Sequence, residues 1–123
     1  MPITPGHPLA TWTTQLRKGL LEFCVLSVLD SGDHYGYAIV DRLKQAGVMS
    51  VSQGAVYPVL HRLRHEGFVD GRVEASDRGP QRRYFSLTPL GRRRLSEMRE
   101  HWTGLTRSIE QLDGTPKRGG KKP

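Results

Sequence analysis

The sequence predicts a mainly α-helical domain with one small β-hairpin, followed by a long C-terminal helix. Three observations support this fold class. Segments in which apolar residues recur every three or four positions are separated by glycines, as is typical of helices that end at a left-handed residue. Between two of these segments, short β-prone runs flank a Gly-Pro turn. Thr88 followed by Pro89 is typical of a helix start, with a capping hydroxyl and then proline in the first turn.

The predicted helices cover residues 14–31, 35–46, 52–66 and 89–113, and the hairpin falls between the third and fourth helices. The order helix, helix, helix, hairpin, helix is that of a winged helix-turn-helix. Apolar residues on one face of the second and third helices can pack on the first helix.

This order divides the chain into four parts. Residues 1–13, rich in Pro, Thr and Gly, are expected to form a flexible N-terminal arm. Residues 14–88 form the winged helix-turn-helix domain, and residues 89–113 form the long C-terminal helix. Residues 114–123 consist largely of Gly, Pro, Lys and Arg, which predicts a disordered basic tail.

The charge balance indicates a polyanionic partner. Lysine and arginine outnumber aspartate and glutamate by 19 to 12, and the isoelectric point is about 10.1. DNA, RNA and an anionic membrane surface all fit a basic protein, and a basic surface also promotes solubility. Charge alone does not choose among these possibilities.

Several classes of function find no support in the residues. The single cysteine, Cys24, lies in an apolar run and is expected to be a small core residue, and no zinc-ligand spacing is present. We see no paired carboxylates, activated nucleophile or phosphate-binding loop, so we expect neither an enzyme nor a cofactor. No apolar run approaches the ~20 residues of a membrane span, and no signal peptide is recognisable, so the expected location is cytoplasmic.

The start of the third predicted helix is the best candidate for reading DNA. Residues near the start of such a helix reach deepest into the major groove, where Gln can pair bidentately with adenine. Gln53 is therefore the candidate base reader, unless it only closes a capping box with Ser50. Tyr57 either donates to a phosphate or packs against the second helix. The full predicted contact set of this helix is Ser52, Gln53, Gly54, Tyr57 and His61.

Arginines in the hairpin form a second candidate contact region. The predicted hairpin carries Arg72, Arg78, Arg82 and Arg83, which can enter the minor groove or hold phosphates, and Arg78, Arg82 and Arg83 are the residues predicted to contact DNA. The alternative is an ordinary solvated turn, and Glu74 and Asp77 reduce the positive charge there.

An apolar seam along the last helix predicts dimerisation. Its residues are spaced alternately by three and four, as in a coiled coil. They are Leu95, Met98, Trp102, Leu105, Ile109 and Leu112. A helix packed on its own domain could show the same stripe, but the length of this helix favours a homodimer. Trp102 lies mid-seam, where two copies could form an aromatic slot for a flat ligand; otherwise it is a core residue.

The residues also resemble those of PadR-type (phenolic acid decarboxylase regulator) repressors. The matching segments are Tyr35–Ile39, Ser52–Leu63 with Gly67–Val69, and Arg82–Gly91. The resemblance covers about residues 16–100. Two departures are Ala55, where the family usually has Thr, and Gln81, which splits a more usual basic cluster; both concern DNA contacts rather than the fold.

This resemblance implies a homodimeric repressor that binds double-stranded DNA through a winged helix and is released by a small, often aromatic, molecule. It also adds Tyr35 and Tyr37, at the start of the second helix, to the predicted DNA-contacting residues. A protein-interaction module that kept the winged helix and binds DNA only non-specifically is the alternative, and weak, salt-sensitive binding without sequence preference would distinguish it.

Overall fold

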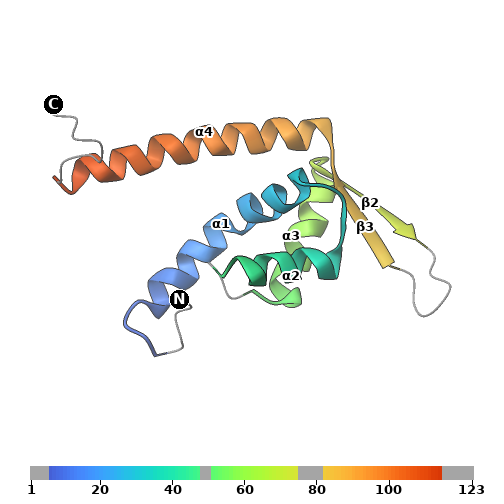
Figure 1. Ribbon diagram of the computed structural model, residues 1–123, viewed down its shortest axis with the longest axis horizontal. Helices are drawn as coiled ribbons and strands as arrows, with labels where there is room; N and C mark the ends of the chain where they lie inside the picture. The colour runs from blue at the N-terminus through green and yellow to red at the C-terminus, as the bar shows by residue number, and fades with distance from the viewer. Residues whose placement is uncertain (1–5, 48–50, 75–81, 115–123) are drawn as a thin grey trace.

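The computed structural model describes residues 6–47, 51–74 and 82–114 of the chain, and Figure 1 shows how their elements are arranged. The elements, in chain order, are α1 (Ala10–Asp30), β1 (His34–Tyr35), α2 (Gly36–Ala46), α3 (Gln53–His65), β2 (Val69–Glu74), β3 (Arg82–Leu87) and α4 (Pro89–Leu112). The predicted fold class, a mainly helical winged helix-turn-helix with a small sheet and a long last helix, is confirmed.

The sheet contains one strand more than the predicted hairpin. Its order is β1-β3-β2, and both pairs are antiparallel. The hairpin register joins Val69 to Leu87 and Glu74 to Arg82. β1 has only two residues, His34 and Tyr35, which pair with β3 directly before α2 begins at Gly36. Tyr35 was expected to be helical, but its extended backbone (φ −67°, ψ 153°) makes it the N-cap of α2 instead.

The first helix begins at Ala10, four residues before the expected Thr14, so residues 10–13 are not part of an arm. The hydroxyl of Thr13 donates to the carbonyls of Leu9 and Ala10, and that of Thr14 donates to Ala10, each at 2.8–3.0 Å. Bonding of a threonine hydroxyl to a carbonyl three or four residues earlier is compatible with a helix, so these threonines do not prevent α1 from beginning at Ala10.

The core lies where α1, α2, α3 and the inner face of the sheet meet. Its largest fully buried side chains include Phe85 of β3, Leu26 of α1 and Leu60 of α3. Gly67 (φ 89°) turns the chain from α3 into β2, since few other residues adopt this left-handed conformation. The result is a three-helix unit with the strands on one side, from which the hairpin projects (Figure 1).

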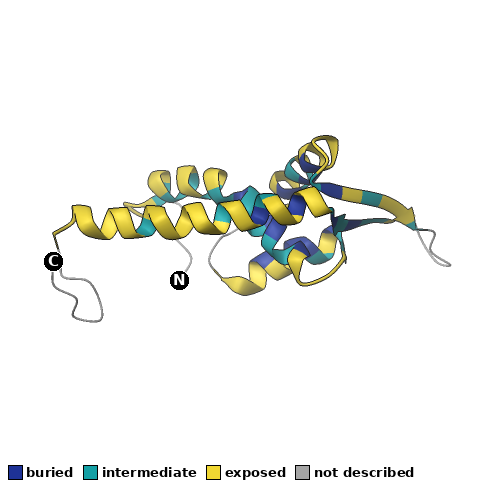
Figure 2. Cartoon of the chain, turned by 90° about the horizontal axis from the view of Figure 1, so that it is seen from above, coloured by how far each residue is buried: buried dark blue, intermediate teal, exposed yellow. Residues whose placement is uncertain are grey.

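α4 lies along α1 and packs on the domain through its first half, up to Trp102. The Thr88 hydroxyl caps α4 by accepting from the N–H of Gly91 at 2.9 Å. A Cβ added at Gly91 would overlap the carbonyl oxygen of Phe68, so glycine is required for this close approach. Asp30 at the end of α1 pairs with two arginines of α4, Arg92 at 3.7 Å and Arg99 at 3.3 Å. Figure 2 shows that most of the rest of α4 is exposed.

Candidate nucleic-acid interface

The first turn of α3 is exposed and carries the predicted base reader. Ser52 is the N-cap, and its hydroxyl oxygen accepts a hydrogen bond from the N–H of Ala55 at 3.3 Å. The expected capping box between Ser50 and Gln53 is wrong, because Gln53 is the first residue of the helix and not the third; Ser50 lies outside the described residues. Gln53 and Gly54 are both exposed, so the cap does not occupy the Gln53 side chain.

Tyr57 packs against the start of α2. The side chain is half-buried, and a Cβ added at Gly36 would lie 2.6 Å from its ring and from its hydroxyl. Of the two roles considered for Tyr57, packing against the second helix is therefore the one that the geometry favours. One turn later, exposed His61 lies beside it, with ring centroids 6.4 Å apart. Gly36 allows α2 and α3 to approach this closely.

One arginine of α3, Arg62, pairs with an acidic side chain of α1 although 46% of its own side chain is exposed. The guanidinium of Arg62 pairs with the carboxylate of Glu22 on α1 at 3.0 Å, and the same carboxylate pairs with Arg94 of α4 at 2.9 Å. Only 13% of the Glu22 side chain is exposed. The Arg94 guanidinium also lies over the ring of Phe68, 4.8 Å from its centroid. Glu22 thus joins three helices at one point, a role that sequence reasoning missed because its partners are 40 and 72 residues away.

Tyrosines from β1, α2 and β3 form a cluster beside the hairpin. The rings of Tyr35 and Tyr37 stack with centroids 5.9 Å apart, and Tyr84 meets Tyr35 edge-on at 4.7 Å. Arg82 lies over Tyr37 at 5.1 Å, and its Nη1 donates to the Tyr37 hydroxyl at 3.2 Å. These contacts hold an arginine of β3 against the start of α2, in a cation–π arrangement.

Arg82 and Arg83 of the predicted hairpin set lie on opposite faces of the sheet, because successive side chains alternate along a strand. Arg82 belongs to the tyrosine cluster, whereas Arg83 lies beside Gly71 together with Arg64 of α3. A Cβ added at Gly71 would be 3.1 Å from Arg64 and 3.3 Å from Arg83. Arg78 lies outside the described residues.

Glu74 connects the tyrosine cluster to β2. One carboxylate oxygen accepts from the Tyr35 hydroxyl at 3.0 Å, and the other accepts from Nε of Arg72 at 3.0 Å. Arg72 in turn lies over the ring of Tyr84, 4.6 Å from its centroid. The hydrogen bond to Glu74 is the main cause of a raised pKa of Tyr35, and desolvation adds to it.

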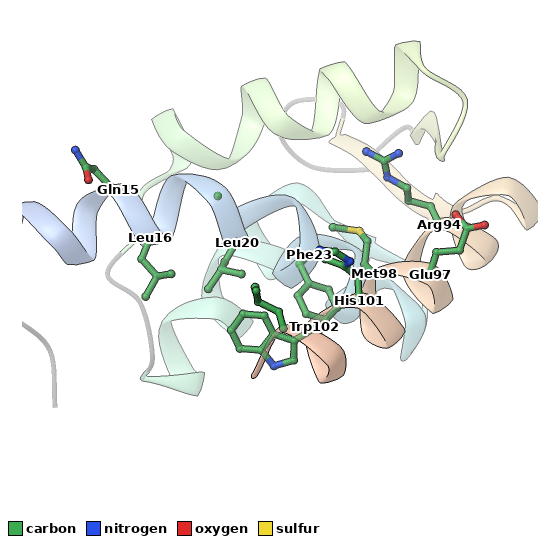
Figure 3. Close-up of a pocket in the computed structure, with 11 residues that line it drawn as sticks. Gln15, Leu16, Leu20, Phe23, Arg94, Glu97, Met98, His101 and Trp102 are labelled. Carbon is green, nitrogen blue, oxygen red and sulfur yellow. The ribbon is translucent and has the colours of Figure 1, made fainter. Parts of the chain in front are cut away.

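A mainly apolar groove of about 510 Å³ runs between α1 and α4. In Figure 3, Leu16, Leu20 and Phe23 of α1 face Met98 and Trp102 of α4. The rings of Phe23 and Trp102 are 6.2 Å apart and tilted by 58°. Arg94, Glu97 and His101 provide polar groups on the α4 side.

The predicted dimerisation seam divides into a buried and an exposed part. Leu95 is 1% exposed and belongs to the protomer's own core, so its assignment to the dimer interface is wrong. Met98 packs against the same core. The exposed fraction then rises along the helix; it is 38% for Trp102, 44% for Leu105, 53% for Ile109 and 84% for Leu112.

The elements that carry the predicted DNA contacts are similar to those of known proteins. A family model described as "Transcriptional regulator PadR-like family" matches residues 25–97, more than half of the chain. The chain belongs to this family. The match spans α2, α3, the hairpin and the first turns of α4.

Solved PadR-family structures share the fold over most of the chain. A PadR-family regulator from Eggerthella lenta is 29% identical, with a TM-score of 0.80 over 87% of this chain and 93% of its own. A Streptococcus transcriptional regulator is 36% identical, with a TM-score of 0.71 over 80% and 97%. Bacillus subtilis PadR in complex with operator DNA is 26% identical, with a TM-score of 0.60 over 64% of this chain and 45% of its own. Among curated proteins, "Transcriptional regulator Rv3488" of Mycobacterium tuberculosis is 28% identical over 95 residues, 77% of this chain and 87% of that protein.

Membership of the PadR-like family makes the protein a transcriptional regulator and not an enzyme. Across the described residues, no cluster of three or more His, Cys, Asp or Glu side chains could hold a metal ion. Within the same part of the chain, no helix is long and apolar enough to cross a membrane. Cys24 is half-buried, and desolvation raises the pKa of its thiol, in line with a packing role.

Proposed function

We propose that this PadR-family regulator is a homodimeric repressor that binds a pseudo-palindromic DNA operator. The observation that carries the proposal is the exposed first turn of α3, with Gln53 and Gly54, next to a sheet that presents Arg82 and Arg83. A helix start in the major groove with basic side chains beside it is the common docking geometry of helix-turn-helix proteins. The complex of B. subtilis PadR with operator DNA supports DNA as the partner.

The exposed stripe of α4 supports the dimer. Trp102, Leu105, Ile109 and Leu112 are apolar residues on one side of the helix, each at least 38% exposed. Leu16 and Trp12 of α1 are exposed as well. An apolar surface of this kind is typically covered by a protein partner. A second copy would place two α3 helices about one turn of DNA apart, ~34 Å.

The groove between α1 and α4 supports regulation by a small aromatic ligand. Its volume of about 510 Å³ lies within the usual ~300–1,000 Å³ range of ligand sites, and Phe23 and Trp102 offer aromatic contact. Quenching of Trp102 fluorescence by a panel of planar aromatic acids, measured with Trp12 replaced by Phe, tests this part. A ligand that quenches Trp102 should also lower the affinity for DNA; the lack of any quenching would count against an effector at this groove.

The first experiment is selection of preferred duplexes from a random DNA library at near-physiological salt. We expect an inverted repeat to be enriched. A reporter transcribed from a promoter with that repeat should fall in output when the regulator is supplied, and a rise would indicate activation. Failure to enrich any sequence, with binding lost as salt is added, would favour a protein-interaction module that binds DNA non-specifically.

As a DNA-binding regulator, the protein is expected in the cytoplasm.

A further inference from the structure

Glu74, the last residue of β2, is an acidic side chain among arginine and tyrosine side chains that suit a polyanion. Antiparallel pairing places Arg72 of β2 opposite Tyr84 and Glu74 opposite Arg82 of β3, while β1 pairs Tyr35 with Tyr84. These five residues therefore share one face of the sheet. A carboxylate at this position repels phosphates, so its direct electrostatic effect opposes DNA binding.

The contacts of Glu74 indicate a second, structural effect, which favours DNA binding. Its two oxygens accept from Tyr35 and from Arg72, both at 3.0 Å, so the carboxylate fixes β2 to the residue that precedes α2. Tyr35 stacks on Tyr37 at an interplanar angle of 10°, and Tyr37 accepts the hydrogen bond of Arg82. A continuous series of contacts thus runs from Glu74 through both tyrosines to Arg82.

We propose that Glu74 is a positioning residue for DNA binding. By holding Tyr35 and Arg72, it keeps the start of α2 and the two hairpin strands in one arrangement and directs the arginines toward DNA phosphates. This inference rests on the proposed DNA-binding function. It gives Glu74 a favourable role in binding, whereas the sequence indicated only that Glu74 reduces the positive charge of the hairpin. Glu74 itself does not contact DNA, because it acts through the tyrosine and arginine side chains.

The proposal predicts that loss of a negative charge weakens binding to a negatively charged partner. Glu74→Leu removes both hydrogen bonds, and Tyr35→Phe removes only the hydroxyl and leaves net charge unchanged. Each variant should lower the affinity for DNA by about threefold to tenfold, as expected for one or two hydrogen bonds. Because the two residues act through one contact, the double variant should lose little more than the weaker-binding single variant. Glu74→Gln keeps an acceptor for Tyr35 and should retain part of the affinity.

Asp70→Asn provides the matched control. Asp70 is an exposed acid on the same strand and the same sheet face as Glu74, so its replacement removes the same charge without touching the tyrosine cluster. This variant should bind as the wild type does, or slightly more tightly. Circular dichroism and thermal unfolding at the assay temperature identify any variant that is not folded.

Affinity should be measured for the full chain across a range of salt concentrations, on both the selected operator and a mixed-sequence duplex. If Glu74 positions Arg82, the dependence of log affinity on log salt should flatten by about one unit in Glu74→Leu, because a phosphate contact is lost. Tighter or unchanged binding by Glu74→Leu, or additive losses in the double variant, would overturn the proposal. The mixed-sequence duplex distinguishes failure of the Glu74 proposal from failure of the proposed function. A wild type without sequence preference would still bind this duplex through phosphate contacts, so the effect of Glu74→Leu on those contacts can still be measured.

Discussion

At the scale of single residues, Glu22 is the clearest case of one side chain that fixes several elements. Its carboxylate pairs with Arg62 of α3 and with Arg94 of α4 while only 13% of the side chain remains exposed. Both arginines are more than 40% exposed, so solvent screens the pairing and limits its contribution.

Glu22→Gln removes the charge and keeps the shape. We expect the free energy of unfolding, measured by urea denaturation, to fall by about 1 kcal/mol, a value discounted for the exposed arginines. Glu66→Gln is the control, because Glu66 also pairs with Arg62, at 3.2 Å, but is 41% exposed. Its effect should stay below about 0.5 kcal/mol. Equal effects of the two substitutions would show that Glu22 has no special structural role.

Gln53→Ala tests base reading directly. The cap of α3 is made by Ser52, so this substitution leaves the helix start intact. Preference at one base position of the operator should relax, at a cost of about 1–3 kcal/mol in binding free energy. Competition between operators altered at single positions measures it, with Gln111→Ala on the last turn of α4 as a control. An unchanged preference would remove Gln53 from the set of base-reading residues.

At the scale of secondary-structure elements, α4 combines a tightly packed start with an open end. Gly91 approaches the Phe68 carbonyl so closely that a methyl group does not fit, whereas a methyl group added at Gly104, on the same helix, would lie in open space. Substitution of Gly91 by alanine therefore tests packing, whereas the same substitution at Gly104 tests helix propensity alone.

Gly91→Ala should lower the free energy of unfolding by about 1–3 kcal/mol, since the carbonyl of Phe68 belongs to the backbone and the packing must shift. Gly104→Ala should raise it by up to about 1 kcal/mol, since alanine is the better helix former. Thermal or urea unfolding of both variants under identical conditions checks the pair. A neutral Gly91→Ala would mean that α4 can move away from the sheet without loss.

Capping residues and apolar periodicity predicted most of the helices and strands. They did not predict contacts between residues that are far apart in the sequence. Thr88 and Pro89 placed the start of α4 correctly, because capping depends on neighbouring residues. β1 was missed, since a two-residue strand has no periodicity and forms only when β3 is beside it. The apolar stripe of α4 was recognised, but spacing alone does not reveal that Leu95 faces the protomer's own core.

The candidate site shows the same division. The first turn of α3 is exposed and Arg82 lies on a hairpin strand, while contact of these residues with DNA stays a prediction. Arg62 pairs with Glu22, 40 residues away, and Tyr35 donates to Glu74, 39 residues away. No motif in this sequence links the members of either pair.

At the scale of the whole molecule, the exposed end of α4 is the surface on which the proposed dimer depends. Ile109→Glu places a charge on this stripe, where 53% of the side chain is exposed. We expect sedimentation to show a shift from dimer to monomer, and affinity for the operator to fall at least tenfold because two half-sites are no longer bound together.

Gln111→Glu adds the same charge elsewhere on the last turns of α4 and should remain dimeric. Both variants should keep the helical circular dichroism of the wild type, since neither residue is buried. A stable dimer of Ile109→Glu would place the interface elsewhere on the molecule.

The buried first half and the exposed second half of α4 are under different constraints as the sequence of such a regulator changes in evolution. The turns up to Met98 are constrained by the core, whereas the turns beyond Trp102 contribute little to the protomer's packing. In the proposed dimer, substitutions that accumulate in the second group would change the choice of partner, or the distance between two bound half-sites, without disturbing the proposed reading helix. One helix would then carry two traits, partner selection and domain integrity, that evolution can alter independently.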